Sequence, residues 1–294
     1  MKAIYDVPAP AKLNLFLHIT GRRNDGYHLL QSAFALIDWC DLLHFECRAD
    51  GVVSREDLGT PLPDEDLIVR AARALQGATG TLLGAHIGVN KRIPTQAGMG
   101  GGSSDAASCL LALNRLWRLG LPLAVLSRMG LALGADVPFF LAGNNAWVEG
   151  VGEQLTPVEL PLARYLVARP PEGLQTSRIF CSPELKRDSE TATISGFAAD
   201  PFGFGRNDLQ DVARGLCPGI DQGLWWLGRY GLAGRMTGSG SAVFARVDEV
   251  RDKIGDGRVD MALRDVPAGF EVRLCSGLGA HPLVGWACDS GLSR

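Results

Sequence analysis

The sequence predicts an α+β protein. Three observations lead to this prediction: apolar residues alternate near the N-terminus, a strand-like segment leads through a glycine-rich loop into a helix, and the composition changes midway. At 294 residues the chain is long enough for one large or two ordinary domains. Pro and Glu become frequent around residues 153–161, so we place a domain boundary there, giving domains 1–154 and 155–294.

The first predicted strand covers residues 9–20. Its apolar face consists of Leu13, Leu15, Leu17 and Ile19. Lys12 and Asn14 share the other face with Phe16 and lie about 7 Å apart along the strand. Such a pair is often solvated. If Phe16 instead partly covers a cleft, Lys12 could hold a phosphate or lower the pKa of a substrate hydroxyl.

A turn is predicted at residues 21–26, followed by a strand that reaches residue 37. Tyr27, His28 and Phe34 lie close together there. They are typical either of a simple core or of a platform on which a flat ring stacks. An isolated histidine is more often structural than catalytic, and the residues alone leave these alternatives open.

A helix is predicted from residue 64 to about 75, and alternation predicts a strand over residues 83–89. A second helix follows the glycine-rich loop, with apolar residues at helical spacing from residue 106 to 117. Ser103 and Ser104 are its expected N-cap residues, with Asp105 in the first turn.

The loop between this strand and this helix is the most informative segment. Its glycines let the backbone turn N–H groups inward, and the helix N-terminus adds further unpaired N–H groups. We therefore interpret it as an anion site long enough for several phosphates, although the glycines could also form only a wide turn. Its residues are Pro94, Thr95, Gln96, Ala97, Gly98, Met99, Gly100, Gly101, Gly102, Ser103 and Ser104.

Asp136 is a lone carboxylate in a run that is otherwise apolar, apart from glycines, from residue 131 to 142. It follows a helix predicted over residues 121–134. Two roles stay open: a turn or cap before Pro138, or a general base held in a dry site.

The remaining segments predict a strand and turn over residues 144–154, a strand at 165–168 and a helix-like segment at 176–180 that could face a cleft. A second run of small residues, 234–241, leads into a strand at 242–245 and could offer more backbone donors to an anion.

Charge and cysteine usage exclude several classes of protein. The net charge of −3 does not favour nucleic acid or an anionic membrane as a partner. Seven scattered cysteines without a C-x-x-C pair do not favour a zinc site or a disulfide framework. The start of the chain has no signal-peptide pattern, and no apolar run is long enough for a transmembrane helix. We therefore expect a cytoplasmic protein.

Several nucleotide-binding motifs are missing. The sequence contains no Gly-Lys pair, so it has no P-loop, and residues 98–105 contain no strict G-x-G-x-x-G. His-Arg-Asp and Asp-Phe-Gly, which mark protein kinases, are also absent. What remains is a different glycine-rich loop, together with Lys12 as a candidate cation and Asp136 as a candidate base.

Residues 10–17, 94–107 and 234–245 resemble the three motifs of the galactokinase/homoserine kinase/mevalonate kinase/phosphomevalonate kinase superfamily. Within that superfamily, residues 21–34 and 133–140 are similar to the kinases that act on 4-diphosphocytidyl-2-C-methyl-D-erythritol. The resemblance is continuous from about residue 8 to 155. In the C-terminal half, a single motif carries it.

The resemblance implies a two-domain small-molecule kinase fold with the active site in the cleft between the domains. It implies ATP-dependent phosphorylation of the 2-hydroxyl of the methylerythritol moiety, with Mg²⁺, in the non-mevalonate route to isoprenoids. Asp136 would take the hydroxyl proton and Lys12 would stabilise the developing oxyanion. Residues 94–104 would hold the ATP phosphates, with Ser103 or Ser104 a candidate magnesium contact. The cytidine end would be held by Asn14, Tyr27, His28, Phe34 and Phe180.

Two loop residues depart from the family pattern, which usually has glycine where Gln96 stands and leucine where Met99 stands. Glutamine does not adopt a positive φ cheaply, so we expect the first turn of the loop to differ.

Alternative functions are a homoserine- or mevalonate-type kinase, or a nucleotide-binding sensor without catalysis. A small aliphatic acceptor needs no aromatic clamp, and a sensor needs neither Lys12 nor Asp136. A protein whose glycine-rich loop is only structural would require three separate motif matches to be coincidence. The expected partner is a small molecule, with no nucleic acid or membrane, and the protein could be a monomer or a homodimer.

Overall fold

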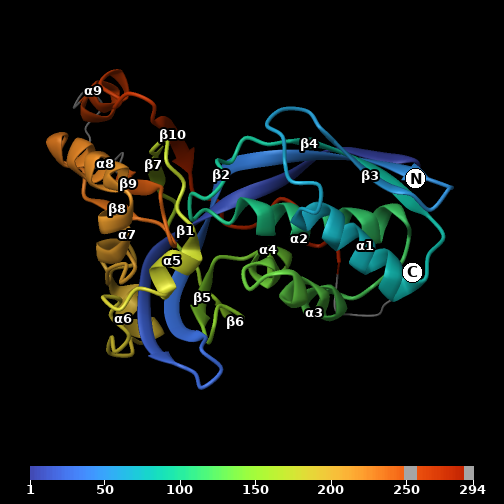
Figure 1. Cartoon of the computed structure of the whole chain (residues 1–294), viewed down its shortest axis with the longest axis horizontal. Helices are drawn as coiled ribbons and strands as arrows, with labels where there is room; N and C mark the ends of the chain where they lie inside the picture. The colour runs from blue at the N-terminus through green and yellow to red at the C-terminus, as the bar shows by residue number, and fades with distance from the viewer. Residues whose placement is uncertain (248–256, 288–294) are drawn as a thin grey trace.

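The computed structural model describes residues 1–247 and 257–287 and contains two β-sheets with helices packed on each (Figure 1). This arrangement confirms the α+β prediction. A long antiparallel pair, β1 (Ala3–Arg22) and β2 (His28–Arg48), extends from one part of the molecule into the other (Figure 1). The turn between these strands lies within the segment where the sequence predicts one.

The first sheet has the strand order β3-β4-β2-β5-β6, and β1 also pairs with β2. Its further strands are β3 (Val53–Asp57), β4 (Gly84–Asn90), β5 (Ala146–Glu149) and β6 (Gln154–Pro157). Its helices are α1 (Leu67–Thr79), α2 (Gly101–Leu116), α3 (Leu123–Leu133) and α4 (Val137–Ala142). Helix α2 packs against β1, β2 and the other three helices, so most of its residues are buried.

The second sheet has the antiparallel order β10-β7-β9-β8. Its strands are β7 (Arg164–Arg169), β8 (Gly234–Met236), β9 (Val243–Val247) and β10 (Glu271–Ser276). The helices of this part are α5 (Thr176–Phe180), α6 (Ile194–Ala199), α7 (Gln210–Leu216), α8 (Pro218–Arg229) and α9 (Arg258–Arg264). The predicted strand at 165–168 and helix at 176–180 are therefore confirmed. The predicted boundary between residues 154 and 155 stays a prediction.

Strand β1 contributes to all three hydrophobic clusters of the structure. Val7 and Ala9 pack under α2, whereas Leu17 and Ile19 belong to the core of the second sheet. Leu13 and its neighbours lie in a third cluster that joins the two sheets. The strand is consequently buried on both faces, which excludes the solvated polar face considered from the sequence.

The start of α2 differs from the sequence prediction. Its N-cap is Gly100 at φ +71°, so Ser103 and Ser104 lie inside the first turn and do not cap it. Asp105 lies past the first turn and forms an ion pair with Lys91. Serine is a favourable N-cap by propensity, but the chain here needs a left-handed residue, which glycine supplies without a Cβ. A Cβ on Gly100 would also lie only 3.0 Å from the ring of Phe140.

No helix within the described residues is long and apolar enough to span a membrane. The six cysteines in the described ranges are all free thiols.

Candidate active site

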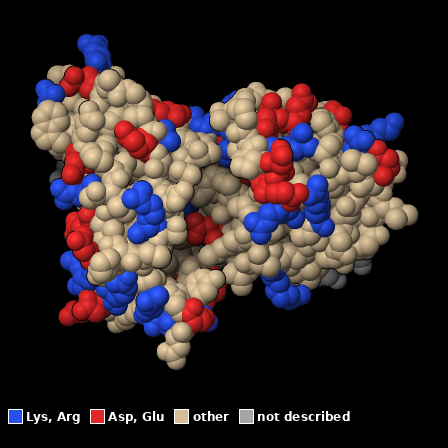
Figure 2. Space-filling model, in the orientation of Figure 1, with Lys and Arg blue, Asp and Glu red and all other residues tan. Residues whose placement is uncertain are grey.

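A pocket of about 840 Å³ lies between the two parts of the molecule, where the surface is hollowed in Figure 2. Residues from the first part include Lys12, Phe34 and the loop 94–103. The second part contributes α5 and the turn at 238–240. The two glycine-rich runs singled out in the sequence therefore line one cavity.

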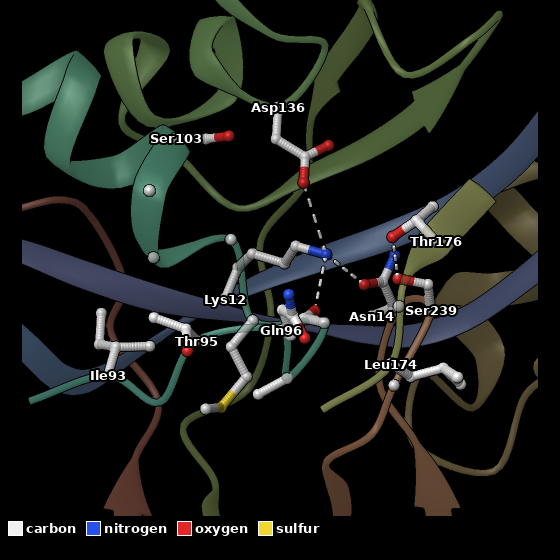
Figure 3. A pocket seen from close by; sticks show the side chains of 18 of the residues that line it. Lys12, Asn14, Ile93, Thr95, Gln96, Ser103, Asp136, Leu174, Thr176 and Ser239 are labelled. Atoms are coloured by element: carbon white, nitrogen blue, oxygen red, sulfur yellow. Dashed lines mark hydrogen bonds and ion pairs between the residues drawn. The ribbon is translucent and has the colours of Figure 1, made fainter. Parts of the chain in front are cut away.

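Lys12 and Asp136 meet in this pocket, with Nζ of Lys12 lying 3.6 Å from Oδ2 of Asp136 (Figure 3). The same ammonium donates to Oδ1 of Asn14 at 2.5 Å and to the carbonyl of Gly98 at 3.1 Å, and it lies 4.7 Å from the centre of the Phe34 ring. Lys12 is only 4% exposed. Burial lowers its pKa, and the nearby Asp136 carboxylate partly offsets that effect.

Asp136 stands at the N-cap position of α4, but its side chain makes no capping hydrogen bond. The carboxylate instead points toward Lys12, and 30% of the side chain is exposed to the pocket and solvent. The backbone thus has the turn role considered from the sequence, while the carboxylate remains available for chemistry. A buried ammonium beside an accessible carboxylate can bind a hydroxyl and receive its proton.

The glycine-rich loop packs tightly against the turn that precedes β9. A Cβ on Gly98 would lie 2.2 Å from the carbonyl oxygen of Thr237, so only glycine fits there. The backbone N–H groups of Ser241 and Ala242 donate to carbonyls of Gln96 and the next residue. Gln96 adopts φ +55° although a positive φ is costly for glutamine, and the expected difference in the first turn of the loop stays a prediction. The flanking backbone hydrogen bonds hold it in that conformation.

Not all loop residues face the cavity. Residues 94–103 line it, and Ser103 points toward the side of the pocket that holds Asp136 (Figure 3). Ser104 is completely buried behind them, and its hydroxyl has no hydrogen-bond partner within the described structure.

A buried ion cluster below the loop was not identified from the sequence. Lys91 pairs with Asp41 and, at 2.6 Å, with Asp105 of α2. Asp41 also accepts the backbone N–H of Ile93 at 2.8 Å. The cluster therefore ties β2, α2 and the start of the loop together. Burial and the neighbouring Asp41 raise the pKa of Asp105 well above its ordinary value, although Lys91 opposes this. The only sequence signal was that lysines are rare in this chain.

The aromatic residues expected at the substrate end separate into two groups. Phe34 and Phe180 line the pocket together with Asn14. His28 does not line it but lies against Phe180, with ring centres 5.0 Å apart. Tyr27 is 64% exposed in the turn before β2 and also lies outside the lining. The structure thus places the rings of Phe34 and Phe180 in the pocket lining, with His28 packed against Phe180.

Comparison with known proteins gives the family. Residues 66–144 match the GHMP kinases N terminal domain, and residues 194–256 match the GHMP kinases C terminal family. A 4-diphosphocytidyl-2-C-methyl-D-erythritol kinase from Albidiferax ferrireducens is 66% identical over 293 residues, covering 100% of this chain and 99% of its own. The chain belongs to the 4-diphosphocytidyl-2-C-methyl-D-erythritol kinase family.

Other members agree with this assignment. The 4-diphosphocytidyl-2-C-methyl-D-erythritol kinase of Variovorax paradoxus is 59% identical over 302 residues, covering 98% of this chain and 100% of its own. A crystal structure of 4-(cytidine 5'-diphospho)-2C-methyl-D-erythritol kinase is 34% identical, with a TM-score of 0.77 and coverage of 92% and 98%. A homoserine kinase from Cytophaga hutchinsonii shares the fold, with a TM-score of 0.70, 16% identity and 96% coverage of both chains. The chain is thus a two-domain phosphotransferase, as its motifs predicted.

Proposed function

We propose that this protein transfers the γ-phosphoryl group of ATP to the 2-hydroxyl of 4-diphosphocytidyl-2-C-methyl-D-erythritol, a step in isoprenoid precursor synthesis. The observation that carries the proposal is the Lys12–Asp136 pair, which lies in one pocket with the glycine-rich loop in a chain of this family. A non-catalytic sensor would not require an ammonium and a carboxylate at this point.

The proposed chemistry uses the two charges in sequence. Asp136 accepts the proton of the 2-hydroxyl while the hydroxyl oxygen attacks the γ-phosphorus in line with the leaving ADP. Lys12 neutralises the negative charge that develops on this oxygen. Because Lys12 is buried and held by Asn14 and Gly98, its ammonium is already oriented and need not reorganise during the reaction.

Residues 94–104 are proposed to hold the ATP phosphates, mainly through backbone N–H groups of the loop and of the first turn of α2. The helix dipole adds to the attraction of the phosphates, so the site needs few cationic side chains.

The donor set fits a magnesium ion that keeps phosphate oxygens among its ligands. Within the described residues, no cluster of three or more His, Cys, Asp or Glu side chains could hold a metal by itself. Mg²⁺ is commonly bound through one or two protein oxygens together with substrate phosphates. Ser103 is the side-chain oxygen proposed to hold it, together with the phosphate oxygens whose charge it would neutralise.

The cytidine end is proposed to bind near Asn14, Phe34 and Phe180, with Tyr27 and His28 completing the site. His28 packs against Phe180, which lines this end of the pocket, and Tyr27 is its neighbour in the chain. We further propose a cytoplasmic location, which agrees with the free thiols of the described cysteines. A small molecule is the expected partner.

A coupled ADP-release assay with ATP and magnesium tests the function. It compares 4-diphosphocytidyl-2-C-methyl-D-erythritol, mevalonate and homoserine as acceptors. Turnover with the cytidyl compound alone is the expected result. Turnover with another acceptor would refute the substrate, and ATP binding without any turnover would favour the sensor.

A further inference from the structure

A chain of three hydrogen bonds leads from the protein core to the ammonium of Lys12. Nζ of Lys12 donates to Oδ1 of Asn14 at 2.5 Å, and Nδ2 of Asn14 donates to Oγ of Ser32 at 2.9 Å. The Ser32 hydroxyl in turn donates to the backbone carbonyl of Phe16 at 2.5 Å. Ser32 is completely buried and is not one of the residues that line the pocket. The chain therefore connects the pocket to a side chain that lies behind its wall.

The pairing of β1 with β2 explains why Ser32 bonds to this carbonyl. The register shifts between Asn14 and Leu17, where two residues of β1 stand opposite one residue of β2. Such a bulge interrupts the ladder and leaves backbone groups without their strand partner. Phe16 lies in this bulge, and the Ser32 hydroxyl supplies a partner for its carbonyl. The bulge thus takes the only proton of that hydroxyl.

This proton determines which way the amide of Asn14 points. Because it is donated to a carbonyl, Oγ of Ser32 can only accept a hydrogen bond from Asn14. The amide must then turn its NH2 group to Ser32 and its oxygen to Lys12. The reversed amide would place its NH2 group against an ammonium, which has donors only. The backbone of Asn14 is held separately, since its N–H donates to Oγ1 of Thr237 at 2.9 Å.

The orientation of the Asn14 amide sets the direction of the Lys12 ammonium. An ammonium has three N–H bonds. Two of them donate to Oδ1 of Asn14 and to the carbonyl of Gly98. The third is left for the side of the pocket that holds the Asp136 carboxylate, whose Oδ2 lies 3.6 Å from Nζ (Figure 3). A substrate oxygen placed there meets a donor that already points toward it.

We propose that Ser32 is a positioning residue for phosphoryl transfer, which directs the Lys12 ammonium through the amide of Asn14. The inference rests on the proposed function, because it concerns how Lys12 meets the oxygen that is phosphorylated. Negative charge develops on this oxygen only in the transition state. A misdirected ammonium therefore lowers kcat and leaves the KM values nearly unchanged.

Steady-state kinetics of Ser32→Ala test this role against a matched control. We expect kcat to fall at least about tenfold, because the Asn14 NH2 group loses its buried acceptor, while KM for ATP and for the acceptor stays nearly the same. Ser108→Ala is the control: Ser108 of α2 is also completely buried, lies outside the pocket lining and donates to the β1 carbonyl of Pro8 at 3.0 Å. It should keep the wild-type kcat. A wild-type kcat in Ser32→Ala, or an equal loss in both variants, would overturn the proposal.

Rescue by a second hydroxyl separates the hydrogen bond from the shape of the side chain. Ser32→Thr keeps a group that can donate and accept, and threonine is favoured in strands, so kcat should be close to that of the wild type. A kcat as low as that of Ser32→Ala would contradict the role of the hydroxyl. If Ser32→Ala does not fold, Ser32→Cys replaces it, because a thiol fills the site but accepts hydrogen bonds only weakly.

A double-mutant cycle with Asn14→Leu tests whether Ser32 acts through Asn14. Leucine is similar in size to asparagine but cannot transmit the hydrogen bond. In this background, Ser32→Ala should lower kcat by less than about twofold, because the two changes interrupt the same chain. The full tenfold loss in the Asn14→Leu background would show that Ser32 acts by another route and would refute the proposal.

The hold of Ser32 on Asn14 can also be measured without any substrate. The NH2 signals of Asn14 in ¹H–¹⁵N spectra of the full chain are assigned by their loss in Asn14→Leu. Their hydrogen exchange should be at least about tenfold faster in Ser32→Ala than in the wild type and in Ser108→Ala. Equal exchange would overturn the proposal even if the proposed function holds. If the wild-type enzyme phosphorylates no acceptor, the proposed function fails, and the exchange rates still decide whether Ser32 fixes the amide.

Discussion

Replacement of Asp136 by asparagine is the most direct test of the proposed chemistry. The amide has nearly the same shape as the carboxylate but cannot accept the proton of the acceptor hydroxyl. Loss of a general base typically costs about 10²–10⁴ in rate. The carboxylate also supports the charge on Lys12, whose pKa is lowered by burial and raised by Asp136. We therefore expect kcat to fall toward the upper end of that range.

ATP affinity should change little in this variant. Within the described residues, the carboxylate pairs with Lys12 and forms no hydrogen bond with residues 94–104. Stability should also change little, because the Asp136 side chain is partly exposed and the Lys12 ammonium keeps its hydrogen bonds to Asn14 and Gly98. Thermal unfolding of both proteins checks that the fold is intact.

Single-turnover kinetics and calorimetric titration with a non-hydrolysable ATP analogue separate the two effects. The reasoning is refuted if kcat falls less than about tenfold. It is equally refuted if affinity for the analogue is lost in parallel with turnover, because Asp136 would then act on the nucleotide rather than on the acceptor.

Three further variants test other parts of the site and the fold. Phe34→Ala should raise KM for the cytidyl substrate much more than KM for ATP in steady-state assays; equal increases would remove Phe34 from the substrate end. Lys91→Met should destabilise the protein by about 3–5 kcal/mol in urea unfolding, because two buried carboxylates lose their common cation. A loss below about 1 kcal/mol would show that the cluster does not depend on the Lys91 ammonium. Burial lowers the pKa of His281 to about 4. Its folded-state pKa lies below the unfolded value of about 6.5, so its contribution is present above pH 6.5 and is lost as the pH falls toward 4. The full loss corresponds to about 3 kcal/mol. His281→Asn should flatten urea-derived stability between pH 6.5 and 4, and an unchanged slope would exclude His281 as its source.

Local patterns in the sequence were sufficient to predict many elements. Alternation predicts β4, an uninterrupted apolar run predicts β7, and the glycine-rich loop correctly precedes α2. An isolated carboxylate in an apolar run marked Asp136, because burial of a charge without a partner is costly. The family motifs then linked Asp136 to Lys12, which periodicity alone could not do.

Interactions between residues far apart in the sequence could not be predicted from such patterns. Lys91 meets Asp41 only because β2 and β4 pair, and Arg187 reaches His28 from a polar stretch without periodicity. The start of α2 was wrong because N-cap propensity favours serine, whereas close packing against Phe140 and a left-handed turn require Gly100. Side-chain propensity describes a residue by itself, but these features depend on what lies opposite it.

The placement of β1 has a consequence for how the molecule can be divided. Leu17 and Ile19 lie in the core of the second sheet, although they belong to the N-terminal strand. Residues 155–294 expressed alone would lack this strand and expose an apolar surface. Neither half is therefore an independent folding unit, and the chain should unfold in a single cooperative transition. Exchange of halves between relatives would succeed only if β1 is exchanged together with the second sheet, whose core it completes.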